Sequence, residues 1–287
     1  TPTPTPTPTP NFSALKSAID ASSFSDVYVV VGNANGILYS YQKGQQGPNT
    51  VTPIGSATKY YSGVVIMRLV EAGVLNLNDH PQKFLSYWTS DPNDPRSQVT
   101  LQQLLSFTSG FNYAENDDQC IRDGNTTIQA CAQQYYNRGL VNGVTPGTTF
   151  AYGPAHLQIA AAIAEVATGK SFPTLFTEQV AGPTGMTASA YVMPSTTNPR
   201  IAAGVSSTAT DTGKFLQALL AGRLLTNLSV YTQDRTAGLP VVNQPDATVD
   251  YGQWHYALSA WRECDDTPFS PACANQRILS SPGAYGW

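Results

Sequence analysis

The order of strand-like and helix-like segments constrains the fold of this chain more than any other feature. Residues rich in β-branched and aromatic side chains lie at both ends, in DVYVVVGNANGILYSYQKG (26–44) and in YGQWHYALSAWREC and QRILSSPGAYGW (251–264 and 276–287). The turn residues from Asn33 to Gly36 predict a hairpin in the first of these segments. A sheet formed by both ends of the chain around a helical middle predicts an α+β fold.

Apolar spacing predicts the helices and divides the chain into parts. Thr100 is expected to cap one helix, and Gly169 to end another. We expect a sheet subdomain of residues 11–75 and 200–287, with a helical subdomain of residues 76–199 inserted between them. The expected helices cover residues 11–24, 56–72, 100–110, 154–169, 171–186 and 204–225.

Residues 1–10, TPTPTPTPTP, form a repeat that cannot be a helix or a central strand. In the polyproline II conformation, at about 3.1 Å per residue, it makes a stiff stalk of roughly 30 Å. Thr-Pro tracts are typical of O-glycosylated stalks. N-glycosylation sequons begin at Asn11, Asn125 and Asn227. The stalk and the sequons favour a secreted or cell-surface glycoprotein.

The four cysteines form two sequence-local pairs, Cys120 with Cys131 and Cys264 with Cys273. Of the three possible connectivities, we prefer this one because closing a short loop costs the least entropy. Neither pair has the C-x-x-C spacing of a zinc or redox site. The alternative is four unpaired thiols in a cytosolic enzyme.

Composition argues against several classes of partner. Charged residues make up 12% of the chain, the net charge is -4, and the 15 Lys and Arg residues are scattered, so no basic face for nucleic acid is expected. No apolar run reaches the roughly 20 residues of a membrane span. His80, His156 and His255 match no metal-ligand spacing, and Asp117 and Asp118 are typical of a solvated loop. We expect no metal and no cofactor.

The segment TPIGSATKYYSGVVIMRLVEAGVL (residues 52–75) holds a serine and a lysine three residues apart at the start of an apolar helix. On a helix, Lys59 lies on the same face as Ser56, so its amine can reach the serine hydroxyl. Loss of hydration beneath a cleft favours a neutral amine, which can accept the serine proton. The alternative is an apolar helix with an anchoring lysine, and the spacing alone does not separate the two.

Other segments favour the nucleophile. PIGSATKYYSGVVIMRLVEAGVLNLND and VTLQQLLSFTSG resemble the serine β-lactamase and D-Ala-D-Ala carboxypeptidase superfamily, in its class C and esterase-like branch. PGTTFAYGPAHLQIAAAIAEVATGKSF, VAGPTGMTAS and AAGVSSTATDTGKFLQALLAG continue the resemblance in family order. The resemblance extends from about residue 27 to the end. It implies an antiparallel sheet flanked by helices, with an inserted helical subdomain.

Position by position, the resemblance implies catalytic roles. Ser56 matches the acylated nucleophile and Lys59 its proton-accepting partner. Tyr152 matches the tyrosine of the Tyr-x-Asn motif, which relays protons between the serine and the leaving group. Where the family has the asparagine of that motif, this chain has Pro154, and Phe107 replaces a usual histidine.

The family's third motif, Lys/His-Thr/Ser-Gly, falls on Ser281, Pro282 and Gly283. The resemblance implies an oxyanion hole formed by the backbone N–H groups of Ser56 and Ala284, and one such donor is worth about 3 kcal/mol to an acyl-transfer transition state. Ser281 removes the cation that would hold a substrate carboxylate. Penicillin recognition is therefore not expected, whereas hydrolysis of esters or amides without a carboxylate is. Near this strand, Trp254, Tyr256 and Trp261 resemble the family's YGLGxW strand, where core packing is the default.

In the relatives, the third-motif strand is followed by another sheet strand and a C-terminal helix. Because the sequence ends at Trp287, we expect these elements to be missing from the fold, or supplied by a further segment or by self-assembly.

Two functions from different classes remain. The preferred one is an extracellular serine hydrolase that acts on a small ester or amide through an acyl-enzyme on Ser56. The alternative is a catalytically inactive hydrolase fold that serves as a structural or adhesive surface module on its Thr-Pro stalk.

Overall fold

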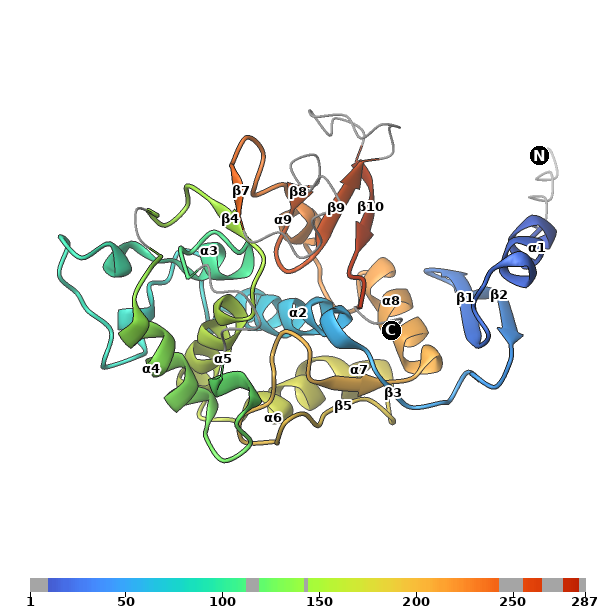
Figure 1. Ribbon diagram of the computed structural model, residues 1–287, viewed down its shortest axis with the longest axis horizontal. Helices are drawn as coiled ribbons and strands as arrows, with labels where there is room; N and C mark the ends of the chain where they lie inside the picture. Colours follow the sequence, from blue (N-terminus) through green and yellow to red (C-terminus); the bar gives the residue numbers. More distant parts are fainter. Residues whose placement is uncertain (1–9, 112–118, 142–143, 243–254, 265–275, 284–287) are drawn as a thin grey trace, which may run out of the picture.

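The computed structural model describes residues 10–111, 119–141, 144–242, 255–264 and 276–283. In Figure 1 the helix α2 (Thr58–Glu71) lies at the centre, with α4 (Ile128–Arg138) and α5 (Ala155–Thr168) on one side and α8 (Ala209–Leu220) on the other. Helices and strands are mixed along the chain, which confirms the predicted α+β class. The proposed subdomain boundaries stay a prediction.

The N-terminal strands form the predicted hairpin. β1 (Val27–Asn33) pairs antiparallel with β2 (Gly36–Lys43), and the register shifts between Val31 and Gly32. One face of the hairpin packs on α8, whose Gly213 lies beside Val30 of β1. The hairpin therefore lies on the far side of α8 from α2 (Figure 1).

The other described strands form three small sheets. The first, in the order β10-β9-β8, and the second, in the order β3-β6-β5, are antiparallel, as expected. In the third, β4 and β7 run parallel. The bounds are β3 (Thr52–Pro53), β4 (Phe150–Ala151), β5 (Ala190–Tyr191), β6 (Val205–Ser207), β7 (Val241–Val242), β8 (His255–Tyr256), β9 (Trp261–Cys264) and β10 (Gln276–Ser280).

The predicted helices around the candidate site are present, with shifted ends. Before α2, a 3-10 turn, η1 (Gly55–Ala57), replaces the expected first helical turn. In α3 (Leu101–Leu105), the side chains of Thr100 and Gln103 each accept a hydrogen bond from the other's backbone N–H, so the predicted cap is confirmed. This helix is shorter than predicted because Phe107 has a φ of 60°, outside the right-handed helical region.

The remaining helical segments connect these elements. α5 ends at Gly169 in a left-handed conformation, as predicted, whereas α4 and α9 were not predicted. The segment 171–186 is helical but irregular, since a π-helical turn interrupts it. The bounds are α1 (Ser13–Ala21), η2 (Pro81–Lys83), η3 (Pro95–Gln98), η5 (Cys120–Arg122), α6 (Phe172–Phe176), η6 (Thr177–Ala181), α7 (Gly182–Thr184) and α9 (Leu228–Thr232).

The core is built around α2 and α5, which pack against each other. Both helices are buried along most of their length, including positions such as Val64 and Ile159 that are 0% exposed. Burying a Val or Ile side chain contributes about 1.5–3 kcal/mol, so these apolar helices hold the candidate site on a rigid base.

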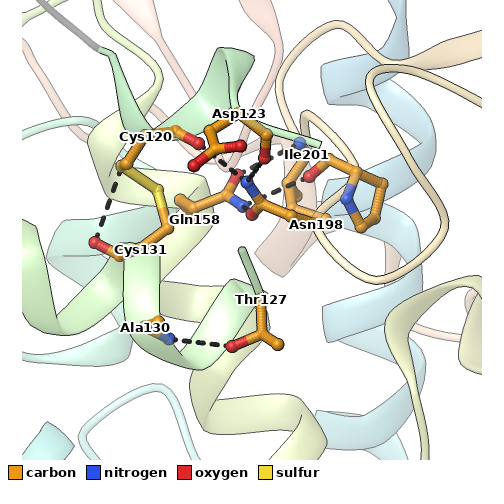
Figure 2. Close-up of a disulfide and its surroundings, with 9 residues drawn as sticks. Cys120, Asp123, Thr127, Ala130, Cys131, Gln158, Asn198 and Ile201 are labelled. Carbon is orange, nitrogen blue, oxygen red and sulfur yellow. Dashed lines mark hydrogen bonds between the residues drawn. A yellow bond between two sulfur atoms is a disulfide. The ribbon is translucent and has the colours of Figure 1, made fainter. Parts of the chain in front are cut away.

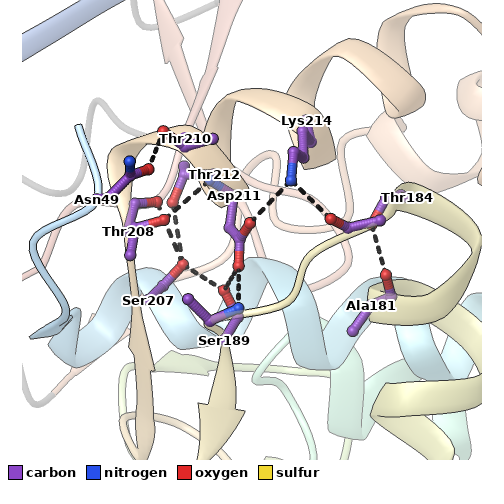
Figure 3. A network of polar contacts seen from close by, with 12 residues as sticks. Asn49, Ala181, Thr184, Ser189, Ser207, Thr208, Thr210, Asp211, Thr212 and Lys214 are labelled. Atoms are coloured by element: carbon purple, nitrogen blue, oxygen red, sulfur yellow. Dashed lines mark hydrogen bonds and ion pairs between the residues drawn. The ribbon is translucent and has the colours of Figure 1, made fainter.

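A polar network fixes the start of α8 (Figure 3). The Thr208 side chain accepts a hydrogen bond from Asp211 N and caps the helix. Asp211 accepts hydrogen bonds from Ala188 N and Ser189 Oγ and pairs with Lys214 at 3.3 Å. Although burial alone would raise the pKa of Asp211, these donors hold it below its ordinary value. The network ties α8 to the segment that leads into β5.

The Cys120–Cys131 disulfide is present, and it joins η5 to α4 (Figure 2). Cys264 ends β9, but Cys273 lies outside the described residues, so the second pair stays a prediction. The sequon residues Asn11, Asn125 and Asn227 are all exposed, and their glycosylation also stays a prediction. In the described part of the chain, no helix has the length and apolar character needed to cross a membrane.

Candidate active site

Ser56 and Lys59 lie in contact at the start of α2. Gly55 has a φ of 49°, a left-handed conformation that glycine adopts without strain, and it is the first residue of η1. Lys59 Nζ is 2.8 Å from Ser56 Oγ, which is hydrogen-bond distance. Ser56 is half-buried, whereas Lys59 is only 4% exposed. The fold therefore places a buried amine against the hydroxyl of a half-buried serine.

The Lys59 amine has two further neighbours. It donates a hydrogen bond to the carbonyl oxygen of Ala202, at 3.0 Å, and it lies 4.6 Å from the centroid of the Tyr152 ring. The serine hydroxyl, the carbonyl and the ring therefore contact the Lys59 amine, and they replace the water that burial removes from it.

Tyr152 is positioned by aromatic rings. It follows β4 and precedes α5, and its ring stacks on Trp261, with centroids 5.2 Å apart and an interplanar angle of 19°. Phe107 lies at 5.6 Å and Tyr256 at 6.3 Å from it. Trp261 and Tyr256 are buried, so they pack in the core and also form the wall that fixes Tyr152 beside Lys59.

The third-motif position lies against the turn that holds Ser56. Ser281 Oγ donates a hydrogen bond to the Ser56 carbonyl oxygen at 3.2 Å, so the segment after β10 comes next to η1. Gly283 is the last described residue of this segment, and Ala284 lies outside the described residues. The oxyanion hole therefore stays a prediction.

Substitutions relative to the family pattern make this site less polar. Pro154 occupies the N-cap position of α5 with a φ of -80° and supplies no amide. Phe107 is 0% exposed and stacks on His156 at 4.9 Å. Ser281 contributes a hydroxyl where the family has a cation. The described site thus combines one amine with hydroxyl groups and a wall of aromatic rings.

A second serine–base pair lies beneath the aromatic wall. His156 Nδ1 is 2.8 Å from Ser109 Oγ, and His156 Nε2 is 2.9 Å from the carbonyl oxygen of Ala151. Because a carbonyl only accepts, Nε2 carries the proton and Nδ1 accepts from Ser109. Burial lowers the pKa of His156 to about 3. Both side chains are 0% exposed, so this pair is closed to substrate.

The other sequence candidates lie apart from the site. His80 Nδ1 is 2.8 Å from the Val99 carbonyl oxygen, and His255 is hydrogen-bonded to Asp234, so both histidines have structural partners. Asp117, Asp118 and Trp254 lie outside the described residues. Within the described residues, no group of His, Cys, Asp and Glu is suited to hold a metal ion.

Sequence reasoning missed two parts of this region. The Ala202 carbonyl has no sequence signal, because every residue carries one and only the fold brings it to Lys59. Ser109 stands in the quoted segment LLSFTSG, but its pairing with His156 depends on the packing of α5 against the loop after α3.

The α+β architecture is that of β-lactamase-like serine hydrolases. The chain belongs to the Beta-lactamase family, whose profile matches residues 14–287. A crystal structure of a β-lactamase-like protein from Bacteroides dorei DSM 17855 is 27% identical, with a TM-score of 0.77, and the match covers 95% of this chain and 84% of that one.

Two proteins of Staphylococcus aureus are also similar. Protein flp of strain N315 is 26% identical over 157 residues, which is 53% of this chain and 31% of that protein. The teichoic acid D-alanine hydrolase of strain MRSA252 is 27% identical over 161 residues, which is 53% of this chain and 36% of that protein. The matches therefore cover only about a third of the length of these relatives.

Proposed function

We propose that this protein is an extracellular serine hydrolase that forms an acyl-enzyme on Ser56. The observation that carries the proposal is the 2.8 Å contact between Ser56 Oγ and the buried Lys59 Nζ. Family membership supports the same chemistry. The stalk and the sequons support the extracellular location, as does the disulfide between Cys120 and Cys131.

In the proposed reaction, the neutral Lys59 amine takes the Ser56 proton while Oγ forms a bond to the carbonyl carbon of the substrate. The tetrahedral intermediate then expels the alcohol or amine, which takes a proton from Lys59 through Tyr152. Water next attacks the carbonyl carbon of the acyl-enzyme and loses a proton to Lys59 and Tyr152. The acyl group leaves as the acid, and Ser56 Oγ takes a proton back. The N–H groups of Ser56 and Ala284 are the proposed donors to the oxyanion.

The preferred substrate is a small ester or amide without a carboxylate next to the scissile bond. Ser281 and Pro154 supply neither a cation for such a carboxylate nor an amide, and the half-buried ring of Tyr152 offers aromatic surface instead. The name of the related teichoic acid D-alanine hydrolase agrees with a hydrolytic role of this kind.

A fluorophosphonate probe tests the proposal, since it phosphorylates an activated serine. The folded protein is labelled, digested, and the adduct mapped by mass spectrometry. We expect an adduct on Ser56, with no labelling of Ser56→Ala. Absence of an adduct on Ser56 in folded protein would refute the proposal and favour the catalytically inactive surface module.

A further inference from the structure

The backbone turn that presents the Ala202 carbonyl to Lys59 is held from two sides. On the α2 side, Ser62 Oγ donates a hydrogen bond to the Ile201 carbonyl oxygen at 2.6 Å, and Val205 N donates to Thr58 Oγ1 at 3.2 Å. Ser62 and Thr58 are both 0% exposed. Three side chains of α2, those of Thr58, Lys59 and Ser62, are therefore hydrogen-bonded to the backbone of this turn and of the strand after it.

On the α5 side, a single glutamine holds the same turn. Gln158 Oε1 accepts a hydrogen bond from Ile201 N at 3.3 Å, and its Nε2 donates to Asn198 Oδ1 at 2.9 Å and to the Pro199 carbonyl oxygen at 3.2 Å. Figure 2 shows the Gln158 side chain next to that of Asn198, with Ile201 close by. Gln158 is 0% exposed, so these bonds are shielded from bulk solvent.

Asn198 continues this arrangement toward the disulfide. Its Nδ2 donates hydrogen bonds to the carbonyl oxygens of Cys120, at 2.7 Å, and of Asp123, at 3.0 Å. The Gln158 amide therefore bonds Ile201 in the turn, Pro199 just before it, and Asn198. Asn198 is in turn bonded to the loop that bears the disulfide.

The geometry of a neutral amine explains why the position of this turn matters. Such an amine has two N–H donors and one lone pair. When one N–H of Lys59 is directed at the Ala202 carbonyl, rotation about the Cε–Nζ bond is restricted, and the lone pair can be held toward Ser56 Oγ. A misplacement of about 1 Å in such a contact can cost on the order of 100-fold in rate.

We propose that Gln158 is a positioning residue for Lys59: by holding the turn at Ile201, it fixes the Ala202 carbonyl and thereby the orientation of the lysine amine. The inference rests on the proposed function of Lys59 as the base that activates Ser56. Gln158 itself does not touch the reacting atoms.

Gln158→Met tests the inference, since it keeps the length of the side chain and removes its hydrogen bonds. Gln129→Met is the matched control: Gln129 is a half-buried amide of α4 that bonds the Ala162 carbonyl oxygen and Glu165 of α5, away from the turn. Ser62→Ala loosens the same turn from α2 with a smaller change, and it serves where Gln158→Met does not fold.

Two readouts are measured. The first is inactivation by the fluorophosphonate probe, which gives kinact and KI separately. The second is the NMR signal of the two Hε protons of Lys59, which differ in chemical shift when the side chain is held in one orientation. The chain has six lysines, so Lys59 is assigned by comparison with Lys59→Met.

We expect Gln158→Met and Ser62→Ala to lower kinact about tenfold or more with KI unchanged, and to merge the two Hε signals. Gln129→Met should change neither. Unchanged Hε signals in both turn variants would overturn the inference, as would an equal loss of kinact in all three variants. If the wild-type protein is not labelled on Ser56, the proposed function fails, while the Hε signals still decide whether Gln158 positions Lys59.

Discussion

Two serine–base pairs lie at hydrogen-bond distance in this molecule, one at the start of α2 and one beneath the start of α5. The distance from Ser56 Oγ to Lys59 Nζ is 2.8 Å, and so is the distance from Ser109 Oγ to His156 Nδ1. The pairs differ in access. Ser56 is half-buried next to the aromatic wall, whereas Ser109 and His156 are 0% exposed.

The pairs also differ in how their protons are used. Ser109 gives its only proton to His156, and the second nitrogen of His156 is bound to the Ala151 carbonyl. The Ser109 hydroxyl proton and both ring nitrogens of His156 thus have hydrogen-bond partners within the protein, and none is available to a substrate. In the other pair, Lys59 Nζ is 2.8 Å from Ser56 Oγ, and in the proposed reaction it takes the Ser56 proton while Oγ bonds to the substrate. A short contact alone therefore does not separate the two pairs, whereas their exposure does.

The largest expected contrast is between Lys59→Met and His156→Met. Removing the proposed base should lower kcat/KM for a p-nitrophenyl ester by about 10²–10⁴-fold, the usual contribution of general base catalysis. His156→Met should leave kcat/KM within a few-fold of wild type. It should instead lower stability by about 1–3 kcal/mol, because it leaves the Ala151 carbonyl without its donor.

Steady-state kinetics and urea unfolding of the two variants check this contrast. Circular dichroism confirms that each variant is folded before its activity is compared. If both variants lost activity to the same extent while folded, the two pairs would not differ in the way proposed.

The next effect concerns the pH dependence of stability. Burial lowers the pKa of folded His156 to about 3, whereas an unfolded histidine has a pKa of about 6.5. As the pH falls below about 6.5, His156 becomes protonated in the unfolded chain but stays neutral in the folded chain. The stability associated with neutral His156 is therefore complete above this pH and is lost below it, by up to about 1.4 kcal/mol per pH unit.

Urea midpoints at pH 7, 6, 5 and 4 measure this effect. His156→Met should flatten the dependence relative to wild type, and the difference between the two curves removes the contribution of the carboxylates. Parallel curves would show that His156 does not resist protonation in the folded protein.

Much of the architecture was predictable because apolar residues repeat at the spacing of the element they form. The segments of α2, α5 and α8 and the hairpin of β1 and β2 were predicted in this way, and the cap at Thr100 was predicted from its chemistry. α4 was missed because its buried face is formed by Ile128, Cys131, Ala132 and Tyr135, of which only one is a strong aliphatic signal.

The candidate site was predictable only in part. The spacing of Ser56 and Lys59 gave the pair a physical reason, and the ordered resemblance added Tyr152. The contact of the Ala202 carbonyl with Lys59 and the left-handed conformation of Phe107 could not be predicted. Residue types alone do not specify where a backbone group lies or which dihedral angle it adopts. Interactions between residues far apart in the chain, such as Ser281 with Ser56, also required the fold.

A smaller effect should separate the tyrosine hydroxyl from its ring. Tyr152→Phe keeps the ring beside Lys59 and Trp261 but removes the proposed proton relay, so kcat/KM should fall about 10–100-fold. Tyr256→Phe is the matched control, because it removes the hydroxyl of a neighbouring ring. Burial raises the pKa of Tyr256 well above its ordinary value, so this hydroxyl is not expected to give up its proton. The kcat/KM of Tyr256→Phe should stay within about twofold of wild type. Equal effects in both variants would mean that Tyr152 acts through packing.

The smallest effect is expected for Ser109→Ala, which removes one hydrogen-bond donor from the closed pair. His156 Nδ1 then lacks its partner in a site without solvent, at a cost of about 1 kcal/mol in unfolding free energy. The Ala151 bond still holds the ring, so Phe107 and Tyr152 keep their positions and ester turnover should be unchanged. Urea unfolding and kcat/KM measure the two quantities on one preparation. A large loss of turnover without a loss of stability would show that the closed pair takes part in the chemistry, and the distinction between the two serines would then fail.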